Sequence, residues 1–439
     1  QDYSSVIQQT VGGLSTPNFF NIDASINRPG VSSYKEEKQV RSLFGTATFG
    51  FRDLAYIDAS VRNDWSSALP VDNNSYLYYG LSGSLVFTEF DAFSDQDILS
   101  FGKVRASIAQ VGDDLDPYRI LQTFNSGTPY GSQPTQSIPN VLANQNLEPA
   151  ISSDYEFGLD LRFLNGRLRT DVTYYNSVKE NEILQLDAPG SSGYSATLVN
   201  AGKFTTTGWE LALGATAVEQ RDLTVDVNLN WSASTGVVDE LAEGIDTRLL
   251  ESAYFGVQLY AVEGEEWGRA ITSGGYGGTM YHENGQPIIN SAGTSYALEY
   301  NKDLGNILPD WNGGFNLDVN YKNFALGAFI SFQKGGQFYS ISRMFGAYSG
   351  LVSETVGNNS LGNPQRDPVL DSGGNEVTSV PVGQAASNSG GKLLEGVDAN
   401  GNEVAYLVNS VSYWGNMFYN KEEWLEDASY VKLRELKLT

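Results

Sequence analysis

Few side chains in this 439-residue sequence are of the types that perform covalent chemistry. His282 is the only histidine, and the chain has no cysteine. A Ser-His-Asp arrangement would have to use His282, but no nucleophile-elbow motif accompanies it, so we predict a surface-loop histidine. Paired carboxylates for glycoside cleavage stay open, because acids are abundant and their separation is invisible in a sequence. We expect a protein that is not an enzyme.

Acidic side chains dominate the charge of the chain. There are 52 Asp and Glu against 27 Lys and Arg, giving a formal net charge of -25. This balance argues against a nucleic-acid partner, since phosphate binding requires basic side chains. Two acidic clusters contain Asp113, Asp114 and Asp116, and Glu263, Glu265 and Glu266, respectively. We predict solvated surfaces and no cofactor, with calcium in one of these clusters as the alternative.

Several glycine-rich stretches resemble ligand loops only superficially. The stretch 273–278 lacks the lysine and the strand-to-helix setting of a phosphate-binding loop, so we predict a flexible loop. The segment 398–404 lacks the alternating acids and the distal glutamate of an EF-hand. For Asn284-Gly285, Gly373-Gly374 and Asn400-Gly401 we predict small hairpins built on primed turns.

Exposed aromatic rings are the strongest candidates for binding, because their flat faces can stack on sugar rings. The candidate ligand-binding residues are Trp267, Tyr276, Tyr281, Tyr413 and Trp414. The alternatives for each of them are packing within a folded loop and contact with a protein that covers the loops. Trp231 and Trp311 lie at predicted strand ends and are expected to anchor at a membrane interface.

Alternation of apolar and polar residues predicts the elements that carry these side chains. It is clearest over 155–163, 223–231 and 315–321. Successive strand residues point to opposite faces, so each segment has one apolar and one polar face. Further strands are predicted over 40–51, 54–63, 76–87, 100–111, 167–176, 204–216, 324–333 and 429–439. The last segment changes phase, which predicts a β-bulge near Arg434 and Glu435.

The connections between these eleven segments alternate between short and long. The short ones are Arg52-Asp53, 88–99, Asn165-Gly166, 219–222 and Lys322-Asn323. The others contain about 12, 38, 27, 75 and 90 residues, a rhythm typical of a transmembrane antiparallel β-barrel with short periplasmic turns and long extracellular loops. No apolar run approaches the roughly 18 residues of a membrane-spanning helix. Aromatic residues make up 12% of the chain, which suits interfacial girdles.

The two ends of the sequence predict that further strands belong to the same barrel. The first residues are polar and turn-rich, without the features of a signal peptide, and Thr439 falls inside a predicted strand. An open sheet edge would leave unpaired backbone groups in hydrocarbon. We therefore expect residues 1–439 to be part of one barrel domain.

A series of short motifs resembles the SusC/RagA class of TonB-dependent outer-membrane transporters. In chain order they are 61–70 (VRNDWSSALP), 85–89 (LVFTE), 102–107 (GKVRAS), 146–149 (NLEP) with Glu156, 192–194 (SGY), 200–202 (NAG), 208–210 (GWE), 304–306 (LGN), 309–311 (PDW), 321–324 (YKNF) and 424–430 (WLEDASY). Ala150 replaces an acid that is usual in the family. Each motif is weak alone, and their order and spacing carry the resemblance.

The resemblance implies a barrel of about twenty-two strands with an N-terminal plug, of which this chain would supply roughly strands ten to twenty. The plug, signal peptide, TonB box and last two strands would lie outside it. A SusD-like lipoprotein would cover the extracellular mouth, and TonB would act on the plug. The cargo implied is an oligosaccharide or a peptide, imported across a Gram-negative outer membrane. Loops over about 236–310 and 334–426 would supply contacts to the lid and part of the cavity wall.

Two other functions fit parts of the same pattern. A TonB-dependent siderophore or cobalamin receptor would keep the barrel and lack the lid lipoprotein. A surface β-protein without transport activity, such as an adhesin, would also alternate along its strands.

Overall fold

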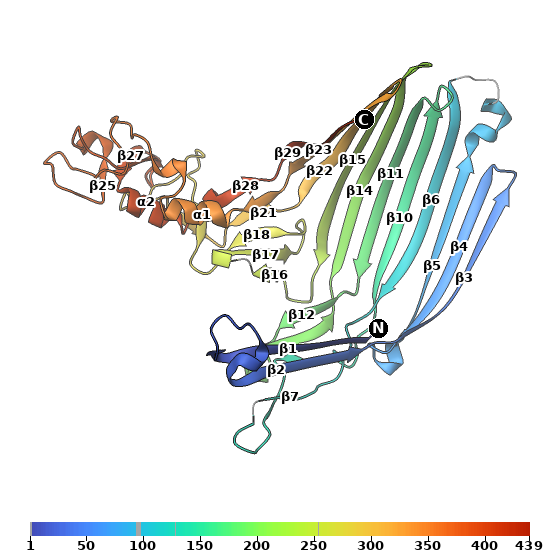
Figure 1. Ribbon diagram of the computed structural model, residues 1–439, viewed down its shortest axis with the longest axis horizontal. Coiled ribbons are helices and arrows are strands. Elements are labelled where there is room, and N and C mark those ends of the chain that lie inside the picture. Colours follow the sequence, from blue (N-terminus) through green and yellow to red (C-terminus); the bar gives the residue numbers. More distant parts are fainter. Residues whose placement is uncertain (1, 94–97, 128, 253) are drawn as a thin grey trace. The chain divides into compact units, whose positions relative to one another are not determined.

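The computed structural model describes residues 2–93, 98–127, 129–252 and 254–439 (Figure 1). The chain divides into two compact units. Unit 1 consists of Gln1–Asn165 and Thr173–Thr205, and unit 2 consists of Gly166–Val172 and Thr206–Thr439.

The main sheet contains eleven strands, whose order in the sheet follows their order in the chain. They are β3 (Val40–Phe51), β4 (Ala55–Ser66), β5 (Ser75–Val86), β6 (Leu99–Asp113), β10 (Ala150–Phe163), β11 (Leu168–Glu180), β14 (Lys203–Glu219), β15 (Leu223–Glu240), β22 (Pro309–Tyr321), β23 (Phe324–Gly335) and β29 (Tyr430–Leu438). Each overlaps one of the eleven segments predicted from alternation, so that prediction is confirmed.

The register of unit 2 places apolar residues opposite apolar residues over four strands. Val227 faces Leu317, which faces Ala328, which faces Leu436. The next row in the same register is Leu229, Phe315, Ile330 and Leu433. Polar residues pair on the other face, as Asn228 does with Asn316. One face of these strands is therefore continuously apolar, as a lipid-facing surface requires.

Unit 1 repeats this arrangement. Ala47 faces Ala59, which faces Leu81, which faces Ile108, which faces Tyr155. The apolar row thus crosses five strands without a polar interruption.

The predicted bulge in β29 keeps the apolar rows aligned. Phe329 pairs with Glu435 and Ile330 with Leu433, so Arg434 is the extra residue. Without it, Leu436 and Leu438 would point to the polar face, because a one-residue slip reverses every side chain. The bulge is confirmed at the predicted place.

Short turns with left-handed residues join the strands on the side of the tight connections. Arg52 and Asp53 have φ of 52° and 56°, and Leu164, Asn165 and Gly166 have φ of 52°, 55° and 82°. Positive φ at both central residues of the Arg52-Asp53 turn is the conformation of a type I′ turn, which matches the twist of paired strands.

Of the two tryptophans predicted at strand ends, Trp231 lies elsewhere and Trp311 lies near an end. Trp231 is inside β15, which continues to Glu240, so its placement at a strand end was wrong. It lies in the row of Gly313, Phe332 and Val431. Trp311 is the third residue of β22, with its ring edge-on to Phe332 at 5.8 Å. Residues 232–240 lack clear alternation, which is why the strand appeared to end early.

A hairpin near the N-terminus was not predicted. β1 (Asp2–Leu14) pairs with β2 (Ser25–Glu37) as a separate two-stranded antiparallel sheet in unit 1. Serine, glutamine and asparagine interrupt the alternation here, so the sequence looks like an irregular polar stretch.

The long connections contain their own small elements. In unit 1 these are β7 (Asn125–Ser126), β8 (Gln136–Ser137), β9 (Val141–Leu142), β12 (Ile183–Asp187) and β13 (Ala196–Asn200). In unit 2 they are β16 (Thr247–Ser252), β17 (Val257–Val262), β18 (Arg269–Thr272), β19 (Gly277–Thr279), β20 (Leu298–Tyr300), β21 (Asp303–Asn306), β24 (Gln337–Tyr339), α1 (Ile341–Tyr348), β25 (Ser379–Pro381), β26 (Lys392–Val397), β27 (Glu403–Val408), α2 (Ser410–Met417) and β28 (Leu425–Asp427). None of the helices in the described part of the chain has both the length and the apolar character needed to cross a bilayer.

Candidate functional site: the folded loop body

The two longest connections, 241–308 and 336–429, fold together in unit 2, and we name them the loop body. The backbone N–H of Gly277 donates to the Tyr419 carbonyl at 3.1 Å, and the N–H of Lys421 donates to the Gly277 carbonyl at 2.7 Å. The Glu422 carboxylate accepts from the N–H of Thr279 and from Lys302 Nζ, both at 2.8 Å. Backbone pairing and a partly buried ion pair therefore join segments more than 100 residues apart in the sequence.

A water-excluded core stabilises the loop body. Met344 of α1 and Met417 of α2 are buried together with Trp414 and Trp424. The indole N–H of Trp424 donates to the Met417 carbonyl at 2.9 Å, so its polar atom is satisfied inside the core. Figure 1 shows α1 and α2 side by side in the orange to red part of the chain.

A polar capping residue precedes each of the two helices that contribute to this core. Ser340 precedes α1 and accepts from the N–H of Arg343, while Asn409 precedes α2 and accepts from the N–H groups of Val411 and Ser412. Such caps satisfy N–H groups that have no partner within the helix.

The glycine-rich stretch is part of this structure, so the prediction of a flexible loop was wrong for its second half. Gly277 and Gly278 are buried in β19, which pairs with β20. A Cβ on Gly277 would lie 2.6 Å from the Glu299 carbonyl oxygen, so only glycine allows this close approach.

Lys421 is a fully buried cation inside an aromatic cage. Its Nζ lies 4.1 Å from the ring centroid of Tyr276 and 4.5 Å from that of Phe418, and it donates to the Phe418 carbonyl at 2.6 Å. Met344 Sδ lies 3.3 Å from the same nitrogen. Among the described residues, no carboxylate forms an ion pair with it. Burial lowers the pKa of the Lys421 ammonium to about 8.

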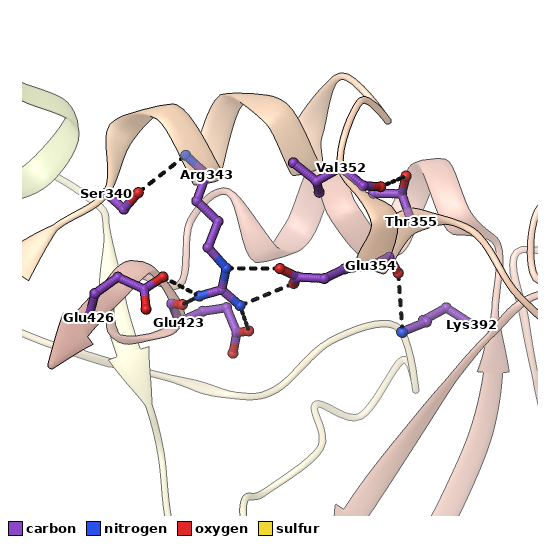
Figure 2. A network of polar contacts seen from close by, with 8 residues as sticks. All are labelled: Ser340, Arg343, Val352, Glu354, Thr355, Lys392, Glu423 and Glu426. Carbon is purple, nitrogen blue, oxygen red and sulfur yellow. Dashed lines mark hydrogen bonds and ion pairs between the residues drawn. The ribbon is translucent and has the colours of Figure 1, made fainter.

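Arg343 is the centre of a polar network on the first turn of α1 (Figure 2). Its guanidinium makes two 3.0 Å contacts to the Glu354 carboxylate. It also contacts Glu426 at 3.1 Å and Glu423 at 3.5 Å. One cation thus faces three acids. The hydrogen bond from Arg343 lowers the pKa of Glu354, whereas burial raises the pKa of Glu423.

The five aromatic residues predicted to bind ligand all lie in the loop body but do not form one surface. Tyr281 is 49% and Trp267 36% exposed, while Trp414 is buried in the core at 6%. Burial raises the pKa of the Tyr413 phenol, consistent with a ring that packs inward. The geometry of Trp414 and Tyr413 favours the packing alternative. A ligand-binding role for any of the five stays a prediction.

Tyr276 instead belongs to a set of contacting rings that sequence analysis missed. We name this set the aromatic patch: Phe255, Tyr276, Phe345, Tyr348, Phe418 and Tyr419. Its members come from four separate stretches of the chain, so no local spacing in the sequence reveals it. The adjacent pair Phe418-Tyr419 after α2 was the one available signal.

The three predicted hairpin turns are present, but their primed geometry was wrong. In each pair only the second residue, a glycine, has positive φ: 81° at Gly285, 78° at Gly374 and 84° at Gly401. A type I turn followed by a left-handed glycine gives the same reversal with three loop residues. Asp371 and Asp398 close two of these turns, and hydrogen bonds from Asn375 and Asn402 lower the pKa of these carboxyls.

Residues considered for chemistry are held by local contacts. His282 lies in the turn next to Gly401, and its Nδ1 accepts from the N–H of Asn284 at 3.4 Å. In the acidic clusters, Asp114 contacts Lys38 and Ser66, and Glu266 accepts from Asn306 Nδ2 at 2.8 Å. Within the described residues, no group of three or more His, Asp or Glu side chains is arranged to hold a metal ion.

In unit 1, the motif residues hold the bases of the loops. Arg62 Nε donates to Asp64 at 2.8 Å, and Tyr78 Oη donates to the same carboxylate at 2.9 Å. Leu69 and Leu147, from two different motifs, are buried in one small cluster. These motif residues therefore make contacts that hold the loop bases together.

Asn200 of the 200–202 motif makes a reciprocal clamp. Its Nδ2 donates to the carbonyls of Glu148 at 2.8 Å and Asn181 at 3.1 Å, and its Oδ1 accepts from the N–H of Glu148 at 2.8 Å. One side chain thus joins the ends of two loops.

Comparison with known proteins identifies the family. Residues 2–371 match the family model described as TonB dependent receptor-like, beta-barrel. The chain belongs to this family. Its fold is an all-β, transmembrane antiparallel β-barrel, and it is located in the outer membrane.

Relatives in this family place it near the SusC and RagA members. The chain is 27% identical over 388 residues to TonB-dependent receptor P26 of Formosa agariphila, covering 81% of this chain and 38% of that protein. It is 23% identical over 315 residues to TonB-dependent receptor SusC of Bacteroides thetaiotaomicron, covering 67% of this chain and 31% of that protein. The RagAB peptide importer in its closed-closed state matches with a TM-score of 0.70 and 19% identity, covering 100% of this chain and 45% of that chain. The chain thus spans less than half the length of each of these relatives.

Proposed function

We propose that this chain forms part of a TonB-dependent transporter that imports a nutrient, an oligosaccharide or a peptide, across the outer membrane. Membership of the TonB-dependent receptor β-barrel family is the observation that carries the proposal. A relative named SusC and the fold of a RagAB peptide importer support the SusC/RagA branch of that family.

The two faces of the strands fit such a role. Apolar rows face hydrocarbon, and the opposite rows, such as Asn228 with Asn316, can line a wet interior. The loop body adds a folded, acidic structure to the long connections, where a family member would meet cargo and partner. We propose that the protein carries its cargo without altering it and without a cofactor.

We further propose that a SusD-like surface lipoprotein is the partner on the extracellular side, and that TonB acts through a region outside this chain. A lidless receptor for siderophores or cobalamin is the alternative. Affinity purification of the full-length protein from native membranes distinguishes the two, because a lipoprotein of about equal abundance should accompany only the SusC/RagA type.

Uptake measurements test the transport itself. Cells that express the full-length protein should accumulate labelled oligosaccharides or peptides, and deletion of TonB or collapse of the proton-motive force should abolish accumulation. Unchanged uptake without TonB would contradict the proposal. Solubility of the full-length protein without detergent would favour a surface protein that does not transport.

A further inference from the structure

We propose that the aromatic patch binds peptides that combine aromatic or aliphatic side chains with lysine or arginine. This inference rests on the proposed import function and selects, between its two cargo classes, peptides. The residues of the patch, all in unit 2, provide the contacts, exposure and charge that carry the argument.

The patch is a continuous set of rings that solvent reaches from outside. Tyr348 is 56%, Tyr419 50%, Phe255 38% and Phe345 38% exposed. Phe418 lies beneath them, with ring centroids 5.2 Å from Tyr348, 5.6 Å from Phe345 and 6.0 Å from Phe255. Single exposed apolar residues are common, but a contiguous group of large ones marks an interaction site.

The backbone is strained where it presents these rings. Phe255 has φ 59° and ψ 42°, a left-handed conformation that is rare for a bulky residue. The next residue, Gly256, also has positive φ, and a Cβ there would lie 2.1 Å from Tyr276 Cδ2. Strain of this kind persists at functional sites when the surrounding structure holds it in place. Here the strained backbone leaves the Phe255 ring exposed to solvent, whereas folding favours the burial of apolar rings.

A rigid support lies under the patch. Tyr276 is held between the Lys421 ammonium, 4.1 Å from its centroid, and the ring of Tyr419, stacked at 5.5 Å and 20°. Because Lys421 is fully buried and donates to the Phe418 carbonyl, it fixes the positions of two patch rings. A preorganised surface loses little conformational entropy when a ligand binds.

The geometry of the three phenylalanine rings of the patch favours an apolar side chain over a sugar. Phe255, Phe345 and Phe418 meet edge-to-face at 72° to 77°, so their faces are turned toward one another's edges. A sugar ring needs an open aromatic face with hydrogen-bonding groups around it, and phenylalanine has no polar atom. An aromatic or aliphatic side chain can add to such an edge-to-face array.

The charge of the loop body favours a basic ligand. Segments 241–308 and 336–429 contain 20 Asp and Glu and 7 Lys and Arg, a net charge of -13. An acidic surface attracts cationic ligands and repels anionic ones. Basic side chains can also lie over the exposed rings of Tyr348 and Tyr419 through cation–π contacts.

Binding of labelled peptides to the full-length protein in detergent tests the inference. The probes are a fluorescein-labelled hexapeptide of alternating Lys and Phe, the same peptide with Ser for Phe, the same peptide with Glu for Lys, and labelled maltohexaose. The variant is Phe345→Ala with Tyr348→Ala, and Phe338→Ala is the matched control, since Phe338 is 54% exposed in β24. Tyr419→Ala provides a second variant outside α1.

The expected result is that the Lys/Phe peptide binds, that both patch variants weaken it about tenfold, and that Phe338→Ala leaves it unchanged. The Ser and Glu peptides should bind more weakly, and added salt should reduce binding. Equal binding of all peptides, no binding, or loss of maltohexaose binding in the patch variants would overturn the inference. So would loss of a co-purifying lipoprotein with peptide binding unchanged, which would make the patch a protein interface.

This experiment separates the inference from the proposed transport function. TonB-dependent uptake that does not respond to the patch variants would overturn the inference and leave the transport function standing. Peptide binding at the patch without TonB-dependent uptake would support the patch and contradict the transport function.

Discussion

The main sheet and the loop body place their apolar side chains in opposite environments. In the sheet, Leu43 and Phe49 of β3 and Val431 of β29, the two strands that end the order of the sheet, are more than 60% exposed. In the loop body, Met344 and Trp424 are completely buried. The first pattern is stable only where lipid replaces water, and the second is that of an ordinary water-soluble core.

The difference implies two independent sources of stability within one chain. Backbone hydrogen bonds and hydrocarbon contact hold the strands, whereas burial of a few large side chains holds the loop body. Local unfolding free energies vary across a structure, and elements that do not share a core can open separately. We therefore expect mutations in the loop body to leave the barrel intact.

Trp424→Ala should produce the largest difference in stability between the loop body and the barrel. It removes a fully buried indole and leaves the Met417 carbonyl without its 2.9 Å donor. A loss of about 3–5 kcal/mol is expected for the loop body. Hydrogen exchange should rise over 241–308 and 336–429, while the heat-modifiable gel mobility of the barrel should not change. Tyr300→Ala, at an exposed position, is the control. Joint loss of both properties would show that the two regions unfold together.

Lys421→Met should stabilise the loop body in a pH-dependent way. The folded-state pKa of about 8 lies below the usual lysine value of 10.5, so the unfolded state binds more protons between these pH values. Stability of the native protein should therefore rise with pH over this range, by about 3 kcal/mol in total. Below about pH 8 the penalty is fully present, and methionine should remove it. Hydrogen exchange at pH 7 and pH 9.5 measures the difference, and an unchanged pH dependence in the variant would contradict the role of Lys421.

The sequence predicted the sheet better than the loop body for a physical reason. Every second residue of a barrel strand contacts lipid, so the alternation of apolar and polar residues marks the ends and the two faces of each strand. The same alternation also revealed the bulge near Arg434. The loop body depends on contacts between distant segments. The pairing of Gly277 with Tyr419 and Lys421 is invisible locally, which is why its glycines looked like a flexible loop.

The same reason explains the outcome for the candidate site. Tyr276 was selected because it is an aromatic residue in a long loop, and it does belong to the aromatic patch. Phe255 and Phe345 of the same patch could not be found, since two residues 90 positions apart in the sequence meet only after folding. Trp414 was selected by the same criterion, yet it is buried, because residue type does not distinguish a packed ring from an exposed one.

Arg343→Gln tests the polar contacts of the loop body separately, because it leaves the hydrophobic core unchanged. Three carboxylates would lose their shared cation, and we expect a loss of about 2 kcal/mol at pH 7 after allowing for partial exposure. The pKa of Glu354 is lowered in the folded state, so its stabilisation is present at neutral pH and is lost as pH falls below its usual value. The raised pKa of Glu423 means that this acid becomes neutral first on acidification.

The effect of Arg343→Gln should therefore shrink toward pH 4, as measured by hydrogen exchange of the loop body. Arg366→Gln is the matched control, because the contacts of Arg366 described in the structure go to the Gly350 and Thr355 carbonyls and the Thr355 hydroxyl, none of which titrates. Its cost should be the same at both pH values. An equal pH dependence in the two variants would exclude the carboxylate network as the cause.

Asn200→Ala should produce the smallest effect and tests how the loops of unit 1 differ from the loop body. These loops are held at their bases by side-chain to backbone hydrogen bonds, and Asn200 makes three of them with Glu148 and Asn181. Their loss should cost about 1–2 kcal/mol locally, because the partner groups become unsatisfied. Exchange should increase at 146–149 and 181–202 and remain unchanged in the loop body.

Two further variants are controls for Asn200→Ala. Asn200→Asp keeps the acceptor for the Glu148 N–H and loses the two donors, so its effect on exchange should fall between those of alanine and the native residue. Ser192→Ala, which removes a contact within one turn, should change exchange there alone. If Asn200→Ala instead increased exchange in the loop body, the two regions would unfold together. The loops of unit 1, which hydrogen bonds hold at their bases, would then not be independent of the loop body, which a hydrophobic core stabilises.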